Sequence, residues 1–326
     1  MSVGIVHPVA SALLAATPPP VLFCPDFTNL SLRTGQGSAT FTRASSGTVP
    51  DANWTWQSMA NNIHRLMRGT WSGSAWSAPG VTTTNRLGMT WFDQDGFGLL
   101  LEPSRTNNVV YGRSLTTWLK AADVTLTTNQ TGIDGAANAA TLYSAGGTAG
   151  WSAAYKSSSL ISGNYVSSCF CRIDTSSGGF LAKSDGATGG VRMGHDPGNG
   201  SSHLITNWSG FDYGTLPCGP SWYRPYVAFT DSGAIYTVHV ALGNTPWNIT
   251  YTFTDPINMV VDANQLEAGY APTTPIYTTS AWTSRASETL KWPATNNLNA
   301  TSGVLVVETE LPFLRDASLL SSGTMG

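Results

Sequence analysis

The segment Ala234-Ile-Tyr-Thr-Val-His-Val-Ala-Leu242 carries the clearest strand signal in the chain. It is rich in β-branched residues, which fit a pleated sheet. Successive side chains of a strand point to opposite faces, so Ile235 and Thr237 share one face while Tyr236 and Val238 share the other. Ser232-Gly233 precedes the segment and is a dipeptide typical of a turn. The pattern predicts a β-strand that begins directly after a turn.

Similar strand-like segments recur along the chain. They are Ser38–Arg43, Asp123–Thr128, Tyr165–Ile173, Trp247–Phe253, Ile257–Val261 and Ser302–Leu311. Turn dipeptides such as Asp134-Gly135 and Ser162-Gly163 separate them. Only Asn62–Arg68 suggests helix, and there we expect a single turn. Short strands at this spacing predict an all-β fold of antiparallel jelly-roll or β-sandwich modules.

The composition supports this fold class and disfavours several functions. Charged residues make up 11% of the chain, less than half of the ~25% usual in globular domains, whereas exposed helix faces are normally rich in charge. The net charge is −3 and no basic patch stands out, which disfavours a nucleic-acid partner. Hydrophobic residues reach 41%, enough to build cores and to argue against disorder.

We expect four parts along the chain. Residues 1–22 form an extended N-terminal arm, because Pro18-Pro19-Pro20 favours polyproline II. Their apolar stretch is too short to span a bilayer, and no Lys or Arg precedes Arg33 as a signal peptide would require. Residues 23–112 form a small β-rich docking region and residues 113–285 a central jelly roll. Residues 286–326 form a linker and the first strand of a further β module, which either pairs with a neighbouring chain or, as we favour, continues into a longer protein.

The four cysteines are Cys24, Cys169, Cys171 and Cys218. Cys169 and Cys171 alternate on one predicted strand, so a disulfide between them would be strained. A bridge from Cys218 to either of them stays open, because connectivity does not follow from sequence. We expect buried free thiols.

Three groups of motifs stand out along the chain. The first is Phe41-Thr-Arg-Ala-Ser-Ser-Gly-Thr48, and the second is Gly98-Leu-Leu-Leu-Glu-Pro-Ser-Arg-Thr-Asn107. The third comprises Asp134–Tyr143, Asn264-Gln-Leu-Glu-Ala-Gly269, Pro275–Thr279 and Thr283-Ser-Arg-Ala286. In order and spacing, over residues 38–288, these motifs resemble those of a widespread class of bacteriophage tail-fibre and virion structural proteins. Members of that class carry a jelly-roll domain similar to carbohydrate-binding modules.

The resemblance implies a structural component of the phage particle, most simply a tail fibre or spike that attaches to host-surface glycans. It implies no enzymatic activity and no catalytic residues. It further implies a homotrimer whose residues 1–22 contact other virion proteins, with no membrane insertion. Two alternatives stay open: a capsid decoration or head-fibre protein without ligand, and an accessory domain of a polysaccharide-degrading enzyme.

Charged residues of these motifs suggest a structural junction. Arg presents a planar fork that matches a carboxylate, so Glu102 could pair with Arg105, and Glu267 with Arg285. Asn107 could satisfy backbone groups of a turn. We expect these side chains to join the modules and not to contact sugar.

Aromatic side chains near loops rich in Gly and Asn are the candidates for glycan contact. They are Trp151, Tyr155, Trp208, Tyr213 and Trp222. Because the chain has 12 Trp, 11 Tyr and 11 Phe, most rings must fill cores. We expect no cofactor and assign no metal ligands, since His195-Asp196 with His203 lacks a recognisable metal-site spacing. A structural Ca²⁺ stays open by analogy with other jelly rolls.

Overall fold

The computed structural model describes residues 24–26, 30–34, 37–51, 53–67, 70–73, 76–77, 83–84, 90–91, 98–137, 140–145, 153–173, 179–184, 192–196, 201–206, 210–218, 221–231, 233, 235–242 and 257–293. These residues form strands and connections, with no helix among them. Accordingly, no helix suited to crossing a bilayer occurs in this part of the chain. The fold class is therefore all-β, as the sequence predicts.

The described residues belong to two compact units, and each is considered by itself. The first unit holds those up to Thr40 and those from Leu290 onward, and the second holds Phe41–Thr289. In the first unit, β1 (Cys24–Asp26) pairs with β2 (Ser31–Thr34). The chain passes between the units within β3 (Thr40–Thr42) and β26 (Thr289–Lys291).

The second unit begins with short antiparallel strand pairs, which we call the hairpin region (residues 41–102). The pairs are β4 (Gly47–Pro50) with β5 (Trp56–Met59), β6 (Arg65–Met67) with β11 (Gly98–Leu100), β7 (Thr70–Trp71) with β8 (Trp76–Ser77), and β9 (Thr83–Thr84) with β10 (Thr90–Trp91). The helical turn expected over Asn62–Arg68 is wrong, because β6 lies there. Arg65 and Leu66 are both buried, so this strand is covered on its two faces and its tertiary contacts override the local sequence preference.

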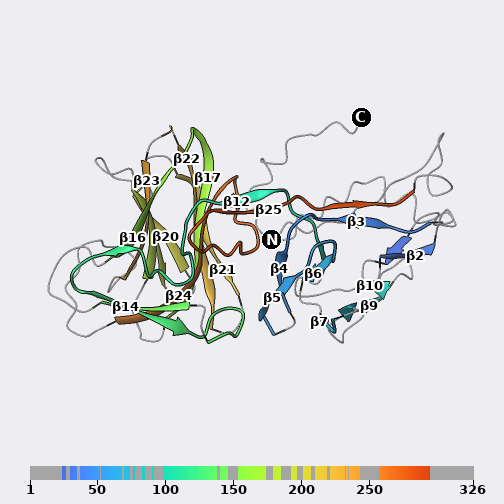
Figure 1. The fold of residues 1–326 in the computed structure, drawn as a ribbon, viewed down its shortest axis with the longest axis horizontal. Coiled ribbons are helices and arrows are strands. Elements are labelled where there is room, and N and C mark those ends of the chain that lie inside the picture. Colours follow the sequence, from blue (N-terminus) through green and yellow to red (C-terminus); the bar gives the residue numbers. More distant parts are fainter. Residues whose placement is uncertain are drawn as a thin grey trace. The chain divides into compact units, whose positions relative to one another are not determined.

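The remainder of the second unit is a β-sandwich of two six-stranded antiparallel sheets (Figure 1). The first sheet has the order β14-β15-β24-β17-β22-β21, with β14 at Val124–Gln130, β15 at Ala140–Ala145, β24 at Ile257–Ala268, β17 at Gly163–Ile173, β22 at Tyr223–Asp231 and β21 at Gly210–Pro217. The second has the order β13-β16-β23-β18-β19-β20, with β13 at Leu119–Lys120, β16 at Ala153–Ser159, β23 at Ile235–Leu242, β18 at Gly179–Ser184, β19 at Arg192–Asp196 and β20 at Ser201–Thr206. Strands of the first sheet contact strands of the second, as β17 does with β18.

The three central strands of the first sheet are buried on both faces. Every residue from 165 to 171, from 224 to 229 and from 259 to 267 is buried. An antiparallel sheet with one face in water would instead alternate buried and exposed residues. One face packs toward the second sheet, where Tyr165 stacks on Phe229 with ring centroids 6.2 Å apart. The other face, which we call the covered face, must therefore carry a second layer of protein.

Two parts of the chain supply this layer. The hairpin region packs Trp56 edge-on against Phe170, with ring centroids 5.3 Å apart, and the Trp56 amide donates to the Ile133 carbonyl at 2.9 Å. The segment that follows β24, residues 270–288, is the second part; there the Thr273 carbonyl accepts from Arg224 Nη1 at 2.6 Å. We call residues 270–288 the closing segment.

Residues 105–112 extend the first sheet beside the end of β24. A bulge interrupts the pairing of β24 with β17, and Ala263 at the bulge has φ +46°. Beyond the bulge the amide of Asn108 donates to the Leu266 carbonyl at 2.8 Å, and the amide of Asn264 donates to the Gly112 carbonyl at 2.8 Å. Immediately before Asn108 in the sequence, β12 (Arg105–Asn107) pairs with β25 (Thr283–Arg285). The chain thus enters and leaves the sandwich through two neighbouring antiparallel strands.

The structure confirms most predicted strands that fall in the described residues. The predictions at 234–242, 165–173, 123–128, 257–261 and 38–43 correspond to β23, β17, β14, β24 and β3. The predictions at Trp247–Phe253 and Ser302–Leu311, like the arm at 1–22, lie outside the described residues. The domain boundaries at 22, 112 and 285 stay predictions. The thiols of Cys169, Cys171 and Cys218 are buried and free, as expected.

Candidate functional site

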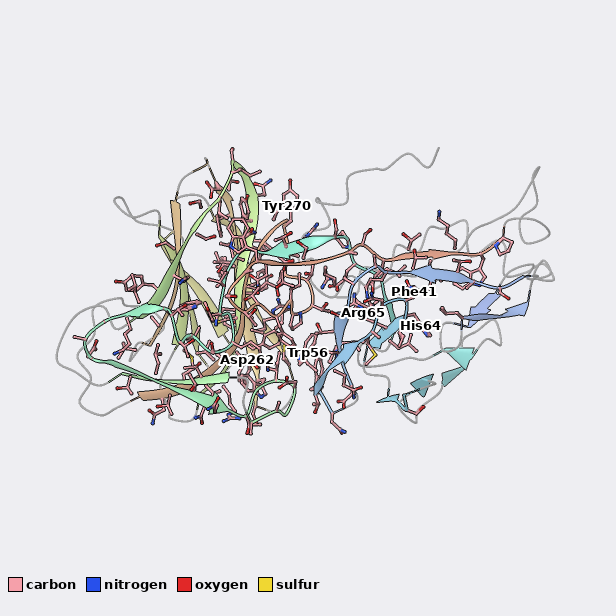
Figure 2. The ribbon with its side chains drawn as sticks, in the orientation of Figure 1. Phe41, Trp56, His64, Arg65, Asp262 and Tyr270 are labelled. Carbon is pink, nitrogen blue, oxygen red and sulfur yellow. The ribbon has the colours of Figure 1, made fainter. Side chains whose placement is uncertain are left out.

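The charged residues of the sequence motifs meet in the interior of the second unit, where the hairpin region and the closing segment adjoin. Arg43, Arg65, Glu102, Arg285 and Glu288 are linked there by short ion pairs, and we call this group the ionic junction. Figure 2 shows Arg65 among the strands of the hairpin region, beside Phe41 and His64. The junction is therefore built from segments far apart in sequence.

Arg65 is the central cation of the ionic junction, and its side chain is fully buried. Its Nε and Nη2 atoms donate to the two carboxylate oxygens of Glu288 at 2.7 and 2.6 Å, which is a bidentate pair. Nη2 also donates to Glu102 Oε2 at 2.8 Å, and Nη1 donates to the Thr48 carbonyl at 2.6 Å. Burial opposes the charge of Arg65, yet the carboxylates of Glu288 and Glu102 outweigh burial and raise its pKa.

Arg43 also binds the carboxylate of Glu288. Its Nη1 donates to Glu288 Oε1 at 2.6 Å, and its Nη2 donates to the Ala60 carbonyl at 2.7 Å. Its Nε donates to the Ser45 carbonyl at 2.7 Å. Burial lowers the pKa of Arg43, although the hydrogen bond to Glu288 partly offsets this effect. Arg43 thereby holds the turn between β3 and β4 onto the end of the closing segment.

Glu102 joins the hairpin region to the closing segment. Its carboxylate accepts from the amide and the hydroxyl of Thr274 at 2.7 and 2.6 Å, and it lies 3.0 Å from Arg285 Nη1. Its amide donates to Glu288 Oε2 at 2.9 Å. Burial would raise the pKa of Glu102, but Arg285, Arg65 and the Thr274 hydrogen bonds outweigh burial and lower it.

A second buried carboxylate, Glu267, lies on the covered face. It accepts from the amide and hydroxyl of Thr273 at 2.7 and 2.6 Å and from Gln265 Nε2 at 2.6 Å. The Nε atom of Arg105 is 4.0 Å from Oε2 of Glu267, too far for a direct hydrogen bond. Burial therefore prevails over these hydrogen bonds and over Arg224, and the pKa of Glu267 is raised.

Asn107 uses both ends of its amide to tie three stretches of backbone together. Its Nδ2 donates to the carbonyls of Asn264 and Ile276, each at 2.9 Å. Its Oδ1 accepts from the amides of Val109 and Leu266, each at 3.0 Å. An amide side chain has two donors and two acceptor lone pairs, so all of its hydrogen-bonding capacity is used.

The expected ion pairs are replaced by others in the structure. Glu102 pairs with Arg65 and Arg285 instead of Arg105, and Arg105 approaches Glu267. Of the residues expected at the junction, Glu102 and Arg285 belong to the ionic junction, whereas Arg105, Asn107 and Glu267 lie outside it. Sequence reasoning assigned no role to Arg43, Arg65 and Glu288, although Arg43 stands in the first quoted motif. Its position inside an otherwise uncharged strand segment was the signal that could have identified it.

The aromatic candidates for glycan contact do not form one described surface. Tyr155 lies on β16, opposite His239 of β23, and is partly exposed. Tyr213 lies on the edge strand β21 and is also partly exposed. Trp222 packs against the core on the covered face, with Arg172 over its ring at 5.4 Å. Trp151 and Trp208 lie outside the described residues.

Two other aromatic residues of the described part are the most exposed, and sequence reasoning missed both. Tyr270, directly after β24, is 49% exposed, and Trp282, directly before β25, is 55% exposed. In Figure 2 the Tyr270 side chain extends away from the ribbon. Both belong to the closing segment, whose many Ser and Thr residues could have signalled an exposed path over the sheet.

The ionic junction has the chemistry of a structural clamp. Its carboxylates are engaged by guanidinium groups, and the pKa of Glu102 is shifted away from neutrality. A general acid or base needs a pKa near the working pH and access to substrate. Within the part of the chain that the structure describes, no group of three or more His, Cys, Asp or Glu side chains could hold a metal ion.

No protein-family model matches the sequence, and no curated protein matches it. Among solved structures, TmCBM61 in complex with beta-1,4-galactotriose is 12% identical with a TM-score of 0.31; the match covers 50% of this chain and 99% of that one. A protein of Bacteroides thetaiotaomicron VPI-5482 to which a sugar-binding role has been ascribed, known from a crystal structure, is 7% identical with a TM-score of 0.28, over 50% of this chain and 95% of that one. At these TM-scores neither similarity assigns a function to the chain.

Proposed function

We propose that this chain is a structural protein of a phage particle, a tail-fibre or spike component that presents its β-sandwich to glycans on the host surface. In this role it is not an enzyme and needs no cofactor. Residues 1–22 attach it to other virion proteins, and the fibre is a homotrimer. The proposal starts from the sequence motifs, whose resemblance is to proteins of this kind.

The observation that supports the proposal best is the convergence of those motifs on one clamp. The segments at 41–48, 98–107 and 264–286 supply Arg43, Glu102, Asn107, Glu267 and Arg285, all of which are buried. Their side chains bind backbone and one another, so they fix the sandwich against the hairpin region. A protein that must present a binding surface at a distance benefits from such rigidity, because less motion is lost on binding.

The composition of the surface is compatible with sugar as the partner. The exposed side chains of the closing segment are largely hydroxyl-bearing, and two exposed rings, Tyr270 and Trp282, lie among them. A ring can cover the apolar face of a sugar while neighbouring hydroxyl and amide groups bond its hydroxyls. With a net charge of −3 over 326 residues, strong electrostatic attraction to a polyanion is not expected.

The test is binding of the purified chain to a glycan array and to surface polysaccharide of candidate host cells, with analysis of released reducing ends. We expect binding without new reducing ends. Absence of binding to every glycan, with the chain located on the phage head by electron microscopy, would favour a decoration protein instead. New reducing ends would show a polysaccharide-degrading activity and would contradict the proposal.

The trimer is tested by sedimentation equilibrium. We expect the mass of three chains at micromolar concentration, since a fibre protein functions as an assembled particle component. A stable monomer under those conditions would remove the trimer from the proposal and leave the glycan-binding part untouched.

A further inference from the structure

Three neighbouring strands of the first sheet each have one terminus at the same end of the sheet. β24 ends at Ala268, β17 begins at Gly163 and β22 ends at Asp231, and they are adjacent in the order β24-β17-β22. Cross-strand pairing places Asn164 opposite Thr230. The amide of Gly269 donates to the Asn164 carbonyl at 2.9 Å, which brings the start of the closing segment to the same place.

The side chains at these strand ends are joined by hydrogen bonds. Asn164 Nδ2 donates to the Tyr270 hydroxyl at 2.9 Å, and the Thr230 hydroxyl donates to Asn164 Oδ1 at 2.9 Å. Tyr270 is 49% exposed, Thr230 is exposed and Asn164 is partly exposed. We propose that Tyr270, Asn164 and Thr230 form a binding site for one uncharged pyranose residue of a glycan, and we call them the Tyr270 site. This inference rests on the proposed function and names the site that would carry it.

The Tyr270 ring is held in place before any ligand arrives. Its hydroxyl is fixed by Asn164, and its backbone follows Gly269, which is itself hydrogen-bonded to Asn164. Gly269 has φ +143°, and a Cβ there would lie 3.0 Å from Arg105 Nη2, so only glycine fits at this bend. Tyr270 is 49% exposed, and a preformed ring loses little conformational freedom when a sugar stacks on it.

Asn164 and Thr230 add the polar groups that a sugar needs. An amide side chain has two donors and two acceptor lone pairs. Asn164 uses one donor for the Tyr270 hydroxyl and one lone pair for the Thr230 hydroxyl. The Thr230 hydroxyl donates to Asn164, so its oxygen can accept from a sugar hydroxyl. Hydroxyl groups both donate and accept, which makes this mixed set suitable for a sugar edge.

The charge near the site favours a neutral ligand over an anionic one. The guanidinium of Arg105 adjoins Gly269 and is only 26% exposed. The carboxylate of Glu267 lies 4.0 Å from its Nε and offsets its charge. This guanidinium is therefore already compensated and offers little to an acidic sugar.

The position of the Tyr270 site also fits a surface that must reach a ligand. Asn164, Val166 and Ser168 alternate onto the same face of β17, which is the covered face. Val166 and Ser168 are buried, whereas Asn164 at the strand end is not. The site lies where the second layer ends, so it combines a rigid base with access from solvent.

The experiment is saturation-transfer NMR and titration of the full chain with methyl glycosides of glucose, galactose and mannose. Three variants are compared with the unmodified chain: Tyr270→Ala, Tyr270→Phe and Asn164→Ala. We expect at least about tenfold weaker binding for Tyr270→Ala, as for the removal of a central aromatic contact. Tyr270→Phe keeps the ring, so its affinity for the glycoside should fall less. The affinity of Asn164→Ala should lie between those of the two Tyr270 variants.

Leu119→Ala is the control, because Leu119 is an exposed apolar side chain of β13, in the second sheet, at 62% exposure. The control variant should bind the glycoside with the same affinity as the unmodified chain. Thermal unfolding should show that all variants are folded. If the unmodified chain binds a glycoside and Tyr270→Ala binds it equally well, the Tyr270 site is overturned while the proposed function stands. If the unmodified chain binds no glycoside and no array glycan, both are overturned.

Discussion

Arg65 and Glu288 form a bidentate ion pair in the interior of the protein, with Nε–Oε1 and Nη2–Oε2 distances of 2.7 and 2.6 Å and both side chains fully buried. A buried pair of this kind contributes little net stability relative to an apolar pair, because both charges have lost their hydration. Removing one partner is different, since the other charge then remains buried alone.

Arg65→Met should accordingly destabilise the second unit strongly. The substitution removes one of the two guanidinium groups that bind Glu288, leaving Arg43, and one of the two that bind Glu102, leaving Arg285. We expect a loss of about 3–5 kcal/mol in the free energy of unfolding, measured by urea denaturation. The control is Lys156→Ala, which removes an exposed hydrogen bond to Thr117. It should change the free energy of unfolding by less than about 0.5 kcal/mol. Equal effects of the two substitutions would contradict the role of the ionic junction.

Glu102 should contribute stability that disappears in acid. Its pKa is lowered in the folded protein, so the contribution is fully present above the unfolded value of about 4.3. It is lost as the pH falls below this value and through the folded pKa. Relative to the unmodified chain, Glu102→Gln should therefore be most destabilised near neutral pH and progressively less so toward pH ~3. A pH-independent difference in unfolding free energy would refute this.

Glu267 should show the opposite dependence. Its pKa is raised in the folded protein, so its favourable contribution is present below the unfolded value of about 4.3 and is lost as the pH rises through the folded pKa. Relative to the unmodified chain, Glu267→Gln should become more stable as the pH rises. Urea denaturation of both glutamine variants across the same pH series tests whether the two slopes have opposite signs.

Asn107→Asp should be strongly destabilising although the two side chains have nearly the same shape. The substitution replaces the donor that binds the Asn264 and Ile276 carbonyls with an acceptor. Leaving such buried groups unpaired costs about 1–3 kcal/mol each, and more for a charged group. The expected result is a large drop in the midpoint of thermal unfolding, partly restored at low pH, where the carboxyl is protonated. Asn61→Asp, at an exposed asparagine, is the matched control.

Gly112→Ala should destabilise the sandwich for a steric reason alone. A Cβ at Gly112 would lie 2.6 Å from the backbone oxygen of Asn264, which cannot rotate away as a side chain could. Overpacking of this kind costs about 1–3 kcal/mol. Gly163→Ala provides the comparison, because there a Cβ would meet Tyr165 at an ordinary 3.6 Å. Equal unfolding free energies for the two variants would show that the backbone relaxes at Gly112.

The buried thiols should be unreactive in the folded protein. Burial raises the pKa of Cys169 and of Cys218 to about 12, and that of Cys171 well above its usual range. Because the thiolate is the reactive species, a thiol reagent at pH ~8 should modify none of them until the chain unfolds. Mass spectrometry of Cys24→Ser after labelling, with and without urea, measures this directly. Labelling of Cys171 in the native chain would contradict its burial.

Strand positions could be predicted from sequence because alternation is a local property. The segment at 234–242 and the segment at 165–173 both became strands. The ion pairs could not be predicted, because Arg65 and Glu288 are separated by 223 residues and nothing local identifies the partner. The sequence even predicted a helical turn at Arg65. Its burial on a strand that is covered on both faces depends on segments that come much later in the sequence. The exposure of Tyr270 was equally hidden, as it depends on where the second layer of protein ends.

The pairing of β12 with β25 has a mechanical consequence. Arg105 lies opposite Arg285, so the chain enters and leaves the sandwich at the same end of one antiparallel pair. A pull on the flanking segments would separate these strands one residue pair at a time, beginning at that end. Glu102 and Arg285 are bound to each other there, and the Glu288 amide donates to the Glu102 carbonyl at 3.0 Å. At this end of the β12–β25 pair, the bonds of Glu102 would therefore have to break before the two strands separate.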